Sequence, residues 1–284
     1  MDLSNYKKEI LQLEKELKNK KLLSNKKEII PKLASILTNA IDKRAKGKIG
    51  IAFSGGVDST LMAFICKKLK KDFILYNVGL KGSKDTEWSK KIAKYYKLGL
   101  KQIIIMPEEA EAIIKKVVKI LPDPSVTKVG VACPEYIVLM EAKKERIKNV
   151  LGGLGSEEIF AGYERHLLAK DKHKECWNGL KTLYEKDLSR DIAVSKALNI
   201  NILCPYLDKD VVSYAMQIDS SLKITEQEKK IILRETAVYL GLKNEFAYRK
   251  KLAAQYGSGF HKAIDKLARK NGFKLKQDYL NSLK

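Results

Sequence analysis

The sequence predicts an α/β protein, in which a parallel sheet carries helices on both faces and a mainly helical C-terminal lobe follows. Three observations predict this class. Short apolar runs alternate with helical runs between residues 49 and 154, a pattern typical of crossover units in a parallel sheet. A cluster of small and polar residues, SGGVDST, directly follows the first apolar run. Beyond residue 165 the strand-like runs stop and helical patterns take over.

Two amphipathic helices are expected before the sheet. Apolar residues recur near helical spacing over 3–21, and a second helix is expected over 29–45. Pro31 is expected in the first turn of that second helix, where its missing N–H is tolerated. Gly47 then breaks the pattern before the first strand begins at Ile49.

The remaining elements follow the alternation. Strands are expected over 49–53, 73–80, 102–107 and 149–154, with helices over 61–69, 88–96, 108–121 and 134–147. In the C-terminal lobe, helices are expected over 183–198, 210–218, 228–242 and 260–270. No Pro/Gly-rich linker separates the two parts, so we expect them to pack closely together.

The composition limits the partners and the compartment. The chain has 56 Lys and Arg against 34 Asp and Glu, a formal charge of +22, which favours a polyanion such as RNA or a nucleotide substrate. Much of this charge lies in helical patterns typical of solvated helix faces. No apolar run approaches the roughly 18 residues that span a bilayer, and no signal peptide opens the chain. We therefore expect a cytoplasmic protein without a membrane partner.

The cysteines and histidines indicate no metal site. Cys66, Cys133, Cys176 and Cys204 are far apart without a CxxC pair, so neither a zinc ribbon nor a disulfide framework is indicated. Buried free thiols are the favoured interpretation, and an iron–sulfur or thiol-transfer role is the alternative. The three histidines show no metal-ligand spacing.

The SGGVDST loop has the chemistry of a phosphate site. Gly55 and Gly56 allow close approach of the backbone to an anion, and Ser54, Ser59 and Thr60 add hydroxyl donors. In a parallel sheet this junction also directs the N–H groups and positive end of a helix at a ligand. Asp58 would repel a phosphate, and a magnesium ion between the two removes the conflict. The loop lacks the lysine of a Walker A motif and the spacing of GxGxxG.

The loop resembles the pyrophosphatase loop of the ATP-pyrophosphatase (PP-loop) superfamily. Its members share the adenine nucleotide alpha hydrolase-like fold and cleave ATP between the α and β phosphates to adenylate a substrate. LGGLGSEEIFAGYERH (151–166) is similar to the SGxGxDExFGGY segment of the asparagine synthetase and β-lactam synthetase branch. CPYLDKDVVSYAMQI and YRKKLAAQYGSG resemble the PFLD segment and the lysine-bearing loop of that branch. The resemblance covers roughly residues 30–270.

The resemblance implies site residues and cofactors. ATP and Mg²⁺ are the implied cofactors, with Asp58 and Glu157 as metal ligands and Lys251 and Glu157 as catalytic residues; Lys250 is the alternative to Lys251. The implied nucleotide-binding residues, together with Gly55 from the loop analysis, are Ser54, Gly55, Gly56, Asp58, Ser59, Val78, Gly155 and Ser156. It also implies a division into an N-terminal helical extension (1–30), an ATP-pyrophosphatase α/β domain (31–165) and a helical C-terminal lobe that completes the active site (166–284).

The chain departs from the branch on the acceptor side. Leu154 replaces the glutamate of the family motif, and leucine cannot accept a proton. Asn201 and Leu203 stand where the family has a carboxylate and a guanidinium, and only Lys128 is basic where an arginine is expected. We therefore expect adenylation to be retained and the acceptor pocket to be altered. The chain starts with Met1 and Asp2 rather than with the cysteine of a glutaminase domain, so a separate glutaminase subunit, free ammonia or another amine would supply nitrogen.

Three functions are compatible with these features. The first is an asparagine synthetase-like ligase that adenylates a carboxylate, with aspartate the leading candidate, and transfers the acyl group to ammonia or an amine. The second is a tRNA-modifying enzyme of the same superfamily that adenylates a base carbonyl and binds RNA through its basic surface. The third is a protein that binds a nucleotide without catalysis.

Overall fold

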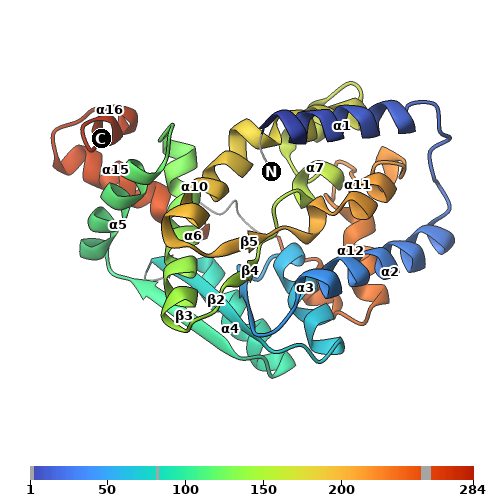
Figure 1. Ribbon diagram of the computed structural model, residues 1–284, viewed down its shortest axis with the longest axis horizontal. Helices are drawn as coiled ribbons and strands as arrows, with labels where there is room; N and C mark the ends of the chain where they lie inside the picture. Colours follow the sequence, from blue (N-terminus) through green and yellow to red (C-terminus); the bar gives the residue numbers. More distant parts are fainter. Residues whose placement is uncertain (1–2, 81–82, 251–256) are drawn as a thin grey trace.

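A computed structural model describes residues 3–80, 83–250 and 257–284. Five parallel strands form one sheet in the order β3-β2-β1-β4-β5 (Figure 1). The strands are β1 (Ile49–Ala52), β2 (Phe73–Leu80), β3 (Leu100–Ile105), β4 (Asn149–Leu151) and β5 (Asn201–Leu203). Helices pack on both faces of this sheet, which confirms the predicted fold class.

Helices make up most of the rest of the chain. Those up to β4 are α1 (Leu3–Leu17), α2 (Lys26–Arg44), α3 (Val57–Lys68), α4 (Lys84–Tyr96), α5 (Pro107–Ile120) and α6 (Val126–Lys144). The α-helices described after it are α7 (Ser156–Ile159), α8 (Glu164–Leu168), α9 (Lys172–Leu183), α10 (Ser189–Leu198), α11 (Lys209–Ala215), α12 (Ile231–Tyr239), α13 (Asn244–Ala247), α15 (Phe260–Lys270) and α16 (Lys276–Asn281). The described residues also form a π-helical turn, η1 (Tyr184–Leu188), and two 3₁₀ turns, η2 (Pro205–Leu207) and η3 (Ser220–Leu222).

The strands divide their side chains between two hydrophobic cores. Ile51 and Leu75 belong to the core under α2, α3 and α4, whereas Tyr76 and Val150 belong to the core under α5, α6 and α15. Neighbouring residues of a strand point to opposite faces of a sheet. A strand buried on both faces therefore shows the continuous apolar run that the sequence displays.

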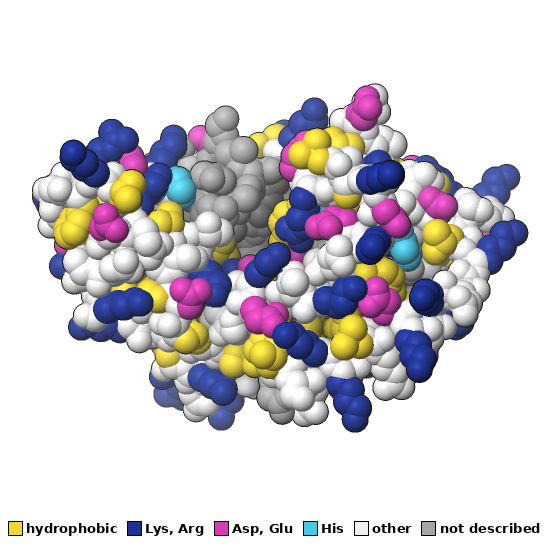
Figure 2. All heavy atoms as spheres, turned by 90° about the horizontal axis from the view of Figure 1, so that it is seen from above, with side chains coloured by type: hydrophobic (Ala, Val, Ile, Leu, Met, Phe, Trp, Pro, Cys, Tyr) yellow, Lys and Arg dark blue, Asp and Glu magenta, His cyan; other side chains and the backbone are white. Residues whose placement is uncertain are grey.

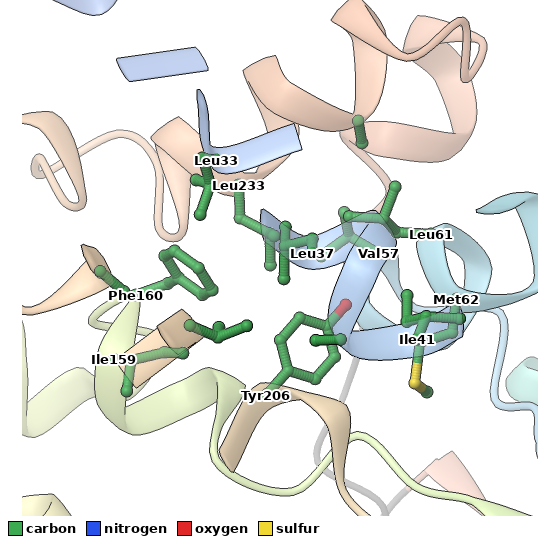
Figure 3. Close-up of a cluster of buried hydrophobic side chains, with 14 of the residues drawn as sticks. Leu33, Leu37, Ile41, Val57, Leu61, Met62, Ile159, Phe160, Tyr206 and Leu233 are labelled. Carbon is green, nitrogen blue, oxygen red and sulfur yellow. The ribbon is translucent and has the colours of Figure 1, made fainter. Parts of the chain in front are cut away.

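The first core extends from the sheet into the C-terminal helices. Leu33 and Leu37 of α2 meet Leu61 of α3, Phe160 and Tyr206 in one cluster (Figure 3). These residues lie far apart in the sequence, and their contact joins the C-terminal helices to the sheet. The prediction that the two parts pack closely is confirmed, whereas the exact division into three parts stays a prediction.

Three of the differences between the structure and the expected elements concern prolines and the sheet. The second helix begins at Lys26, with Asn25 as its N-cap, so Pro31 lies beyond the first turn. Helix α6 begins at Val126 and includes Pro134, where a helix was expected to start. The strand-like runs do not stop at residue 165, because β5 joins the sheet; its three residues are too short to show a periodic pattern.

Basic side chains do not gather into one patch on the face of the molecule seen in Figure 2. Figure 2 shows Lys and Arg side chains spread over the visible face, with acidic side chains among them. Within the described residues, no helix is both long and apolar enough to cross a membrane. The cysteines carry no disulfide, and three of the four are buried, as expected for structural thiols.

Candidate active site

The SGGVDST loop connects β1 to α3 at the carboxyl edge of the sheet. Ser59 Oγ donates to the Gly56 carbonyl at 3.2 Å and lies 3.3 Å from Ser54 Oγ. The Gly56 amide in turn points at Ser54 Oγ at 3.4 Å. Asp58 is in the first turn of α3, and its carbonyl accepts a hydrogen bond from Tyr206. These contacts hold the loop at a helix N-terminus, where an anion is stabilised.

The surroundings of Gly55 give a further reason for a glycine at this position. Its φ is +70°, and a Cβ on it would lie 2.9 Å from Nη1 of Arg249. Arg249 donates to the Ser54 carbonyl at 2.8 Å and pairs with Asp85 at 2.5 Å. Gly55 is therefore needed for a left-handed backbone beneath a buried arginine, and it lines neither of the two cavities described below.

A buried lysine, Lys230, connects the two acidic residues of the predicted metal site. Its Nζ lies 2.8 and 2.9 Å from the two carboxylate oxygens of Asp58, 2.8 Å from Glu157 and 3.1 Å from Ser156 Oγ. We call Asp58, Ser156, Glu157 and Lys230 the Lys230 cluster. Burial lowers the pKa of the Lys230 ammonium, but the charges of Asp58 and Glu157 outweigh it and raise that pKa, so the lysine stays charged.

The backbone around the cluster is constrained at two points. Lys230 has φ +57°, a left-handed conformation that costs a non-glycine residue about 1 kcal/mol. Gly155 has φ +95°, and a Cβ on it would lie 2.4 Å from Cδ2 of Leu207. Only glycine fits there, and it sets the direction of Ser156 and Glu157 at the start of α7.

Two cavities meet at this edge of the sheet. The smaller one, the inner pocket, has a volume of about 260 Å³ and lies between the sheet and α6, where Ser54, Asn77 and Val78 line it. The larger one, the outer chamber, has a volume of about 900 Å³ and contains Asp58, Glu157 and Lys230. Among the described residues, Val131, Leu154 and Arg190 line both cavities.

Four charged residues near this junction form a second buried group, the Arg190 cluster of Glu135, Asp187, Arg190 and Asp191. Arg190 pairs with Asp187 at 2.6 Å and with Asp191 at 2.5 Å, and its Nε lies 3.9 Å from Glu135 Oε2. Burial lowers the pKa of Arg190, and the three carboxylates raise it overall. Burial and the charge of Asp191 raise the pKa of Glu135 well above its usual range.

The positions that depart from the expected motif are now placed. Leu154 lies at the junction of the two cavities, and Lys128 lines the outer chamber and pairs with Asp123 at 2.9 Å. Asn201 donates to Asn149 on the neighbouring strand, and Leu203 packs against the first core. The last two residues therefore support the sheet instead of reaching into a cavity.

The other predicted site residues fall into two groups. Val78 lines the inner pocket and Gly56 the outer chamber, whereas Ser59, Gly155 and Ser156 line neither of the two. Lys251 lies outside the described residues, and its alternative, Lys250, lines the outer chamber.

Sequence reasoning missed Lys230, Arg249 and Glu135. Lys230 is one of two adjacent lysines before a helix, and no spacing relates it to Asp58. Burial next to two carboxylates distinguishes it from its neighbour Lys229, and only the fold shows this burial. Within the described part of the chain, no group of three or more His, Cys, Asp or Glu side chains is placed to hold a metal ion.

The relationship of the chain to known protein families follows from a match over most of its length. The asparagine synthase family model matches residues 32–177 and 169–280. The chain belongs to this family. A putative glutamine-hydrolysing asparagine synthetase of Methanocaldococcus jannaschii is 34% identical over 290 residues, covering 87% of this chain and 53% of that protein. A probable asparagine synthetase of Acanthamoeba polyphaga mimivirus is 30% identical over 211 residues, covering 69% of this chain and 38% of that protein.

This family member spans about half the length of the first of these relatives. Among solved structures, the ammonia-dependent NAD synthetase of Campylobacter jejuni covers 92% of this chain and 93% of its own, at 16% identity and a TM-score of 0.42. The family match confirms the resemblance seen in the sequence at the level of the family.

Proposed function

We propose that this asparagine synthase family member is an ATP-dependent ligase that joins a carboxylate to ammonia or an amine and releases AMP and pyrophosphate. The observation that carries the proposal is the convergence of Asp58, Glu157 and Lys230 beside the N-terminus of α3. The positive end of α3 and the Lys230 ammonium both stabilise negative charge at this point. A triphosphate placed there extends from the inner pocket into the outer chamber.

The reaction balances in two steps. A carboxylate oxygen attacks the α-phosphorus of ATP, and the bond to the β-phosphate oxygen breaks, so that pyrophosphate leaves and an acyl-adenylate remains. The amine nitrogen then attacks the acyl carbon, AMP leaves, and the nitrogen loses a proton. Lys230 is placed to stabilise the charge that builds on the leaving pyrophosphate.

The carboxylates of Asp58 and Glu157 fit a magnesium ion. Both lie within 2.9 Å of the same ammonium nitrogen, so their oxygens reach a common point, and magnesium is bound by one or two carboxylates together with phosphate oxygens. A bound magnesium ion would supply further charge neutralisation on the phosphates. In the structure, the Lys230 ammonium holds the two carboxylates together.

The outer chamber favours an anionic acceptor, which supports aspartate. Its described lining includes nine basic and six acidic side chains; the basic ones are Lys128, Arg165, Lys186, Arg190, Lys229, Lys230, Arg234, Arg249 and Lys250. Several of the acidic ones are already paired with a lysine or arginine, as Glu164 is with Lys229 and Glu228 is with Arg234. Basic side chains near the chamber therefore attract a dicarboxylate.

The test is a product assay with the purified chain, ATP, Mg²⁺ and aspartate, with either ammonium or glutamine as nitrogen source. AMP, pyrophosphate and the amide are expected in equal amounts with ammonium. Use of glutamine only after a second protein is added would indicate a separate glutaminase.

Asp58→Asn is expected to remove the activity, whereas Asp42→Asn, at a half-exposed site paired with Lys71, keeps it. Formation of ADP and phosphate would contradict the proposal, and ATP binding without turnover would favour a non-catalytic nucleotide-binding protein.

The formal charge of +22 favours one alternative, an enzyme that adenylates a base of tRNA. Phosphate contacts make the affinity for RNA fall steeply with salt. A tRNA gel-shift assay at two salt concentrations separates the two functions. Salt-sensitive binding together with tRNA-dependent pyrophosphate release would favour the RNA enzyme over the amide ligase.

A further inference from the structure

The inner pocket contains a buried carboxyl oxygen without a partner. Glu135 of α6 lines this pocket, and its side chain is 16% exposed. Its Oε1 has no hydrogen-bond partner among the described residues. A buried polar atom without a partner costs free energy and calls for an explanation, and a ligand in the pocket provides one.

The surroundings of Glu135 keep its carboxyl group in place. Its Oε2 faces Arg190 at 3.9 Å, and Arg190 is already satisfied by Asp187 and Asp191. Asp191 also interacts with the Glu135 carboxyl group, so this group is held between Arg190 and Asp191. Oε1 is the atom left to interact with a ligand.

The depth of Glu135 in the pocket indicates which part of a nucleotide lies beside it. Val138 and Leu139, one turn further along α6, form an apolar end with Tyr76 and Val150. At the opposite end, Val131 and Leu154 also line the outer chamber. With a base in the apolar end and phosphates toward the chamber, the sugar lies midway, at the level of Glu135.

We propose that Glu135 binds a ribose hydroxyl of the nucleotide and so makes the site prefer ATP to deoxy-ATP. The inference depends on the proposed use of ATP. A carboxylate oxygen accepts a hydrogen bond from a hydroxyl group, and acidic residues recognise ribose in this way in dinucleotide-binding folds. Asp191 and Arg190 are positioning residues that hold the carboxyl group in the pocket.

The experiment measures equilibrium binding of ATP, 2′-deoxy-ATP, 3′-deoxy-ATP and purine riboside triphosphate to the full chain with Mg²⁺ and no acceptor. The wild-type chain is expected to bind one of the two deoxynucleotides about tenfold more weakly than ATP, the effect of losing one hydrogen bond. Glu135→Met is expected to weaken ATP about tenfold and to leave the affinity for that deoxynucleotide unchanged. The matched control is Lys143→Met, an exposed position on the same helix, which keeps the wild-type preference.

Three results would overturn the inference. The first is equal binding of ATP and both deoxynucleotides by the wild-type chain, which requires no variant and is independent of folding. The second is a loss in Glu135→Met that is the same for all four nucleotides, which indicates a structural role. The third is a loss of discrimination against the purine analogue alone, which indicates a contact with the base. Absence of any ATP binding would overturn the proposed function as well, whereas ATP binding without sugar discrimination would overturn this inference only.

Discussion

The Lys230 cluster and the Arg190 cluster both hold one cation among carboxylates, but they differ in which group is left to interact with a ligand. In the Lys230 cluster, one ammonium is held by two carboxylates and a hydroxyl, all on segments that the sequence motifs identify. In the Arg190 cluster, one guanidinium faces three carboxylates, one each on α6, η1 and α10. One carboxyl oxygen of this cluster, Glu135 Oε1, has no hydrogen-bond partner among the described residues. The first cluster therefore presents a cation to the outer chamber, and the second presents an acceptor oxygen to the inner pocket.

The largest expected effect tests how far the Arg190 cluster depends on its single cation. Arg190→Leu leaves three carboxylates close together and is expected to lower the free energy of unfolding by about 3–5 kcal/mol at pH 8. The loss shrinks toward pH 5, because the pKa of Glu135 is already raised and its protonation removes the repulsion. Chemical denaturation at the two pH values measures it. The control is Arg269→Leu, whose side chain is 77% exposed; an equal loss in both variants would contradict the difference between the clusters.

The second effect tests whether the Lys230 cluster serves catalysis. Lys230→Met removes the ammonium that faces the phosphates and is expected to lower the rate of pyrophosphate release about 100- to 1000-fold. Lys43 pairs with Asp210 at the surface and lines neither cavity, so Lys43→Met is expected to stay within about twofold of the wild-type rate. A coupled pyrophosphate assay at saturating ATP compares them. Equal rates for both variants would remove Lys230 from the proposed mechanism.

The third effect tests the backbone that supports the Lys230 cluster. Gly155→Ala places a Cβ against Leu207 at φ +95° and is expected to lower the free energy of unfolding by about 2–3 kcal/mol. Gly47 also has a positive φ, +65°, but nothing lies within 4 Å of its added Cβ. Gly47→Ala is therefore expected to cost only about 1 kcal/mol. Thermal unfolding separates the two contributions, and an equal cost would show that crowding at Leu207 is relieved.

The smallest effect concerns Glu158, the buried neighbour of Glu157, which faces Arg165 at 3.7 Å. Burial, and then the charges of Asp187 and Glu157, raise its pKa to about 7, above the value near 4.5 of the unfolded chain. The folded state therefore binds the extra proton between these values, and stability falls as pH rises through this window. Glu158→Gln is expected to add about 1–2 kcal/mol at pH 8 and nothing at pH 5.

Denaturation curves at the two pH values measure this gain. The control is Glu164→Gln, whose carboxylate is 64% exposed and whose replacement is expected to change stability by less than about 0.5 kcal/mol at both values. A gain that does not depend on pH would show that repacking, and not the charge of Glu158, is responsible.

The sequence predicts the sheet well because its strands are buried on both faces and alternate with amphipathic helices. It misses β5, whose three residues carry no period, and it places the start of α6 too late, because Pro134 suggests a helix start where the helix in fact continues. The site is predicted in the same uneven way. Asp58 and Glu157 belong to short motifs with a chemical reason for each residue, whereas Glu135 and Lys230 are single residues without a local signal.

The sequence by itself determined the α/β class, the position of the glycine- and hydroxyl-rich loop after β1 and membership of the family, because each of these is encoded in local patterns of residues. Only the tertiary structure decided that Lys230, 172 residues after Asp58, is the cation between its carboxylate and that of Glu157. It also decided that Glu135 and Asp191, on two different helices, share one pocket. The physical reason is that the pairing of charges depends on distance in space and on burial, and the fold sets both.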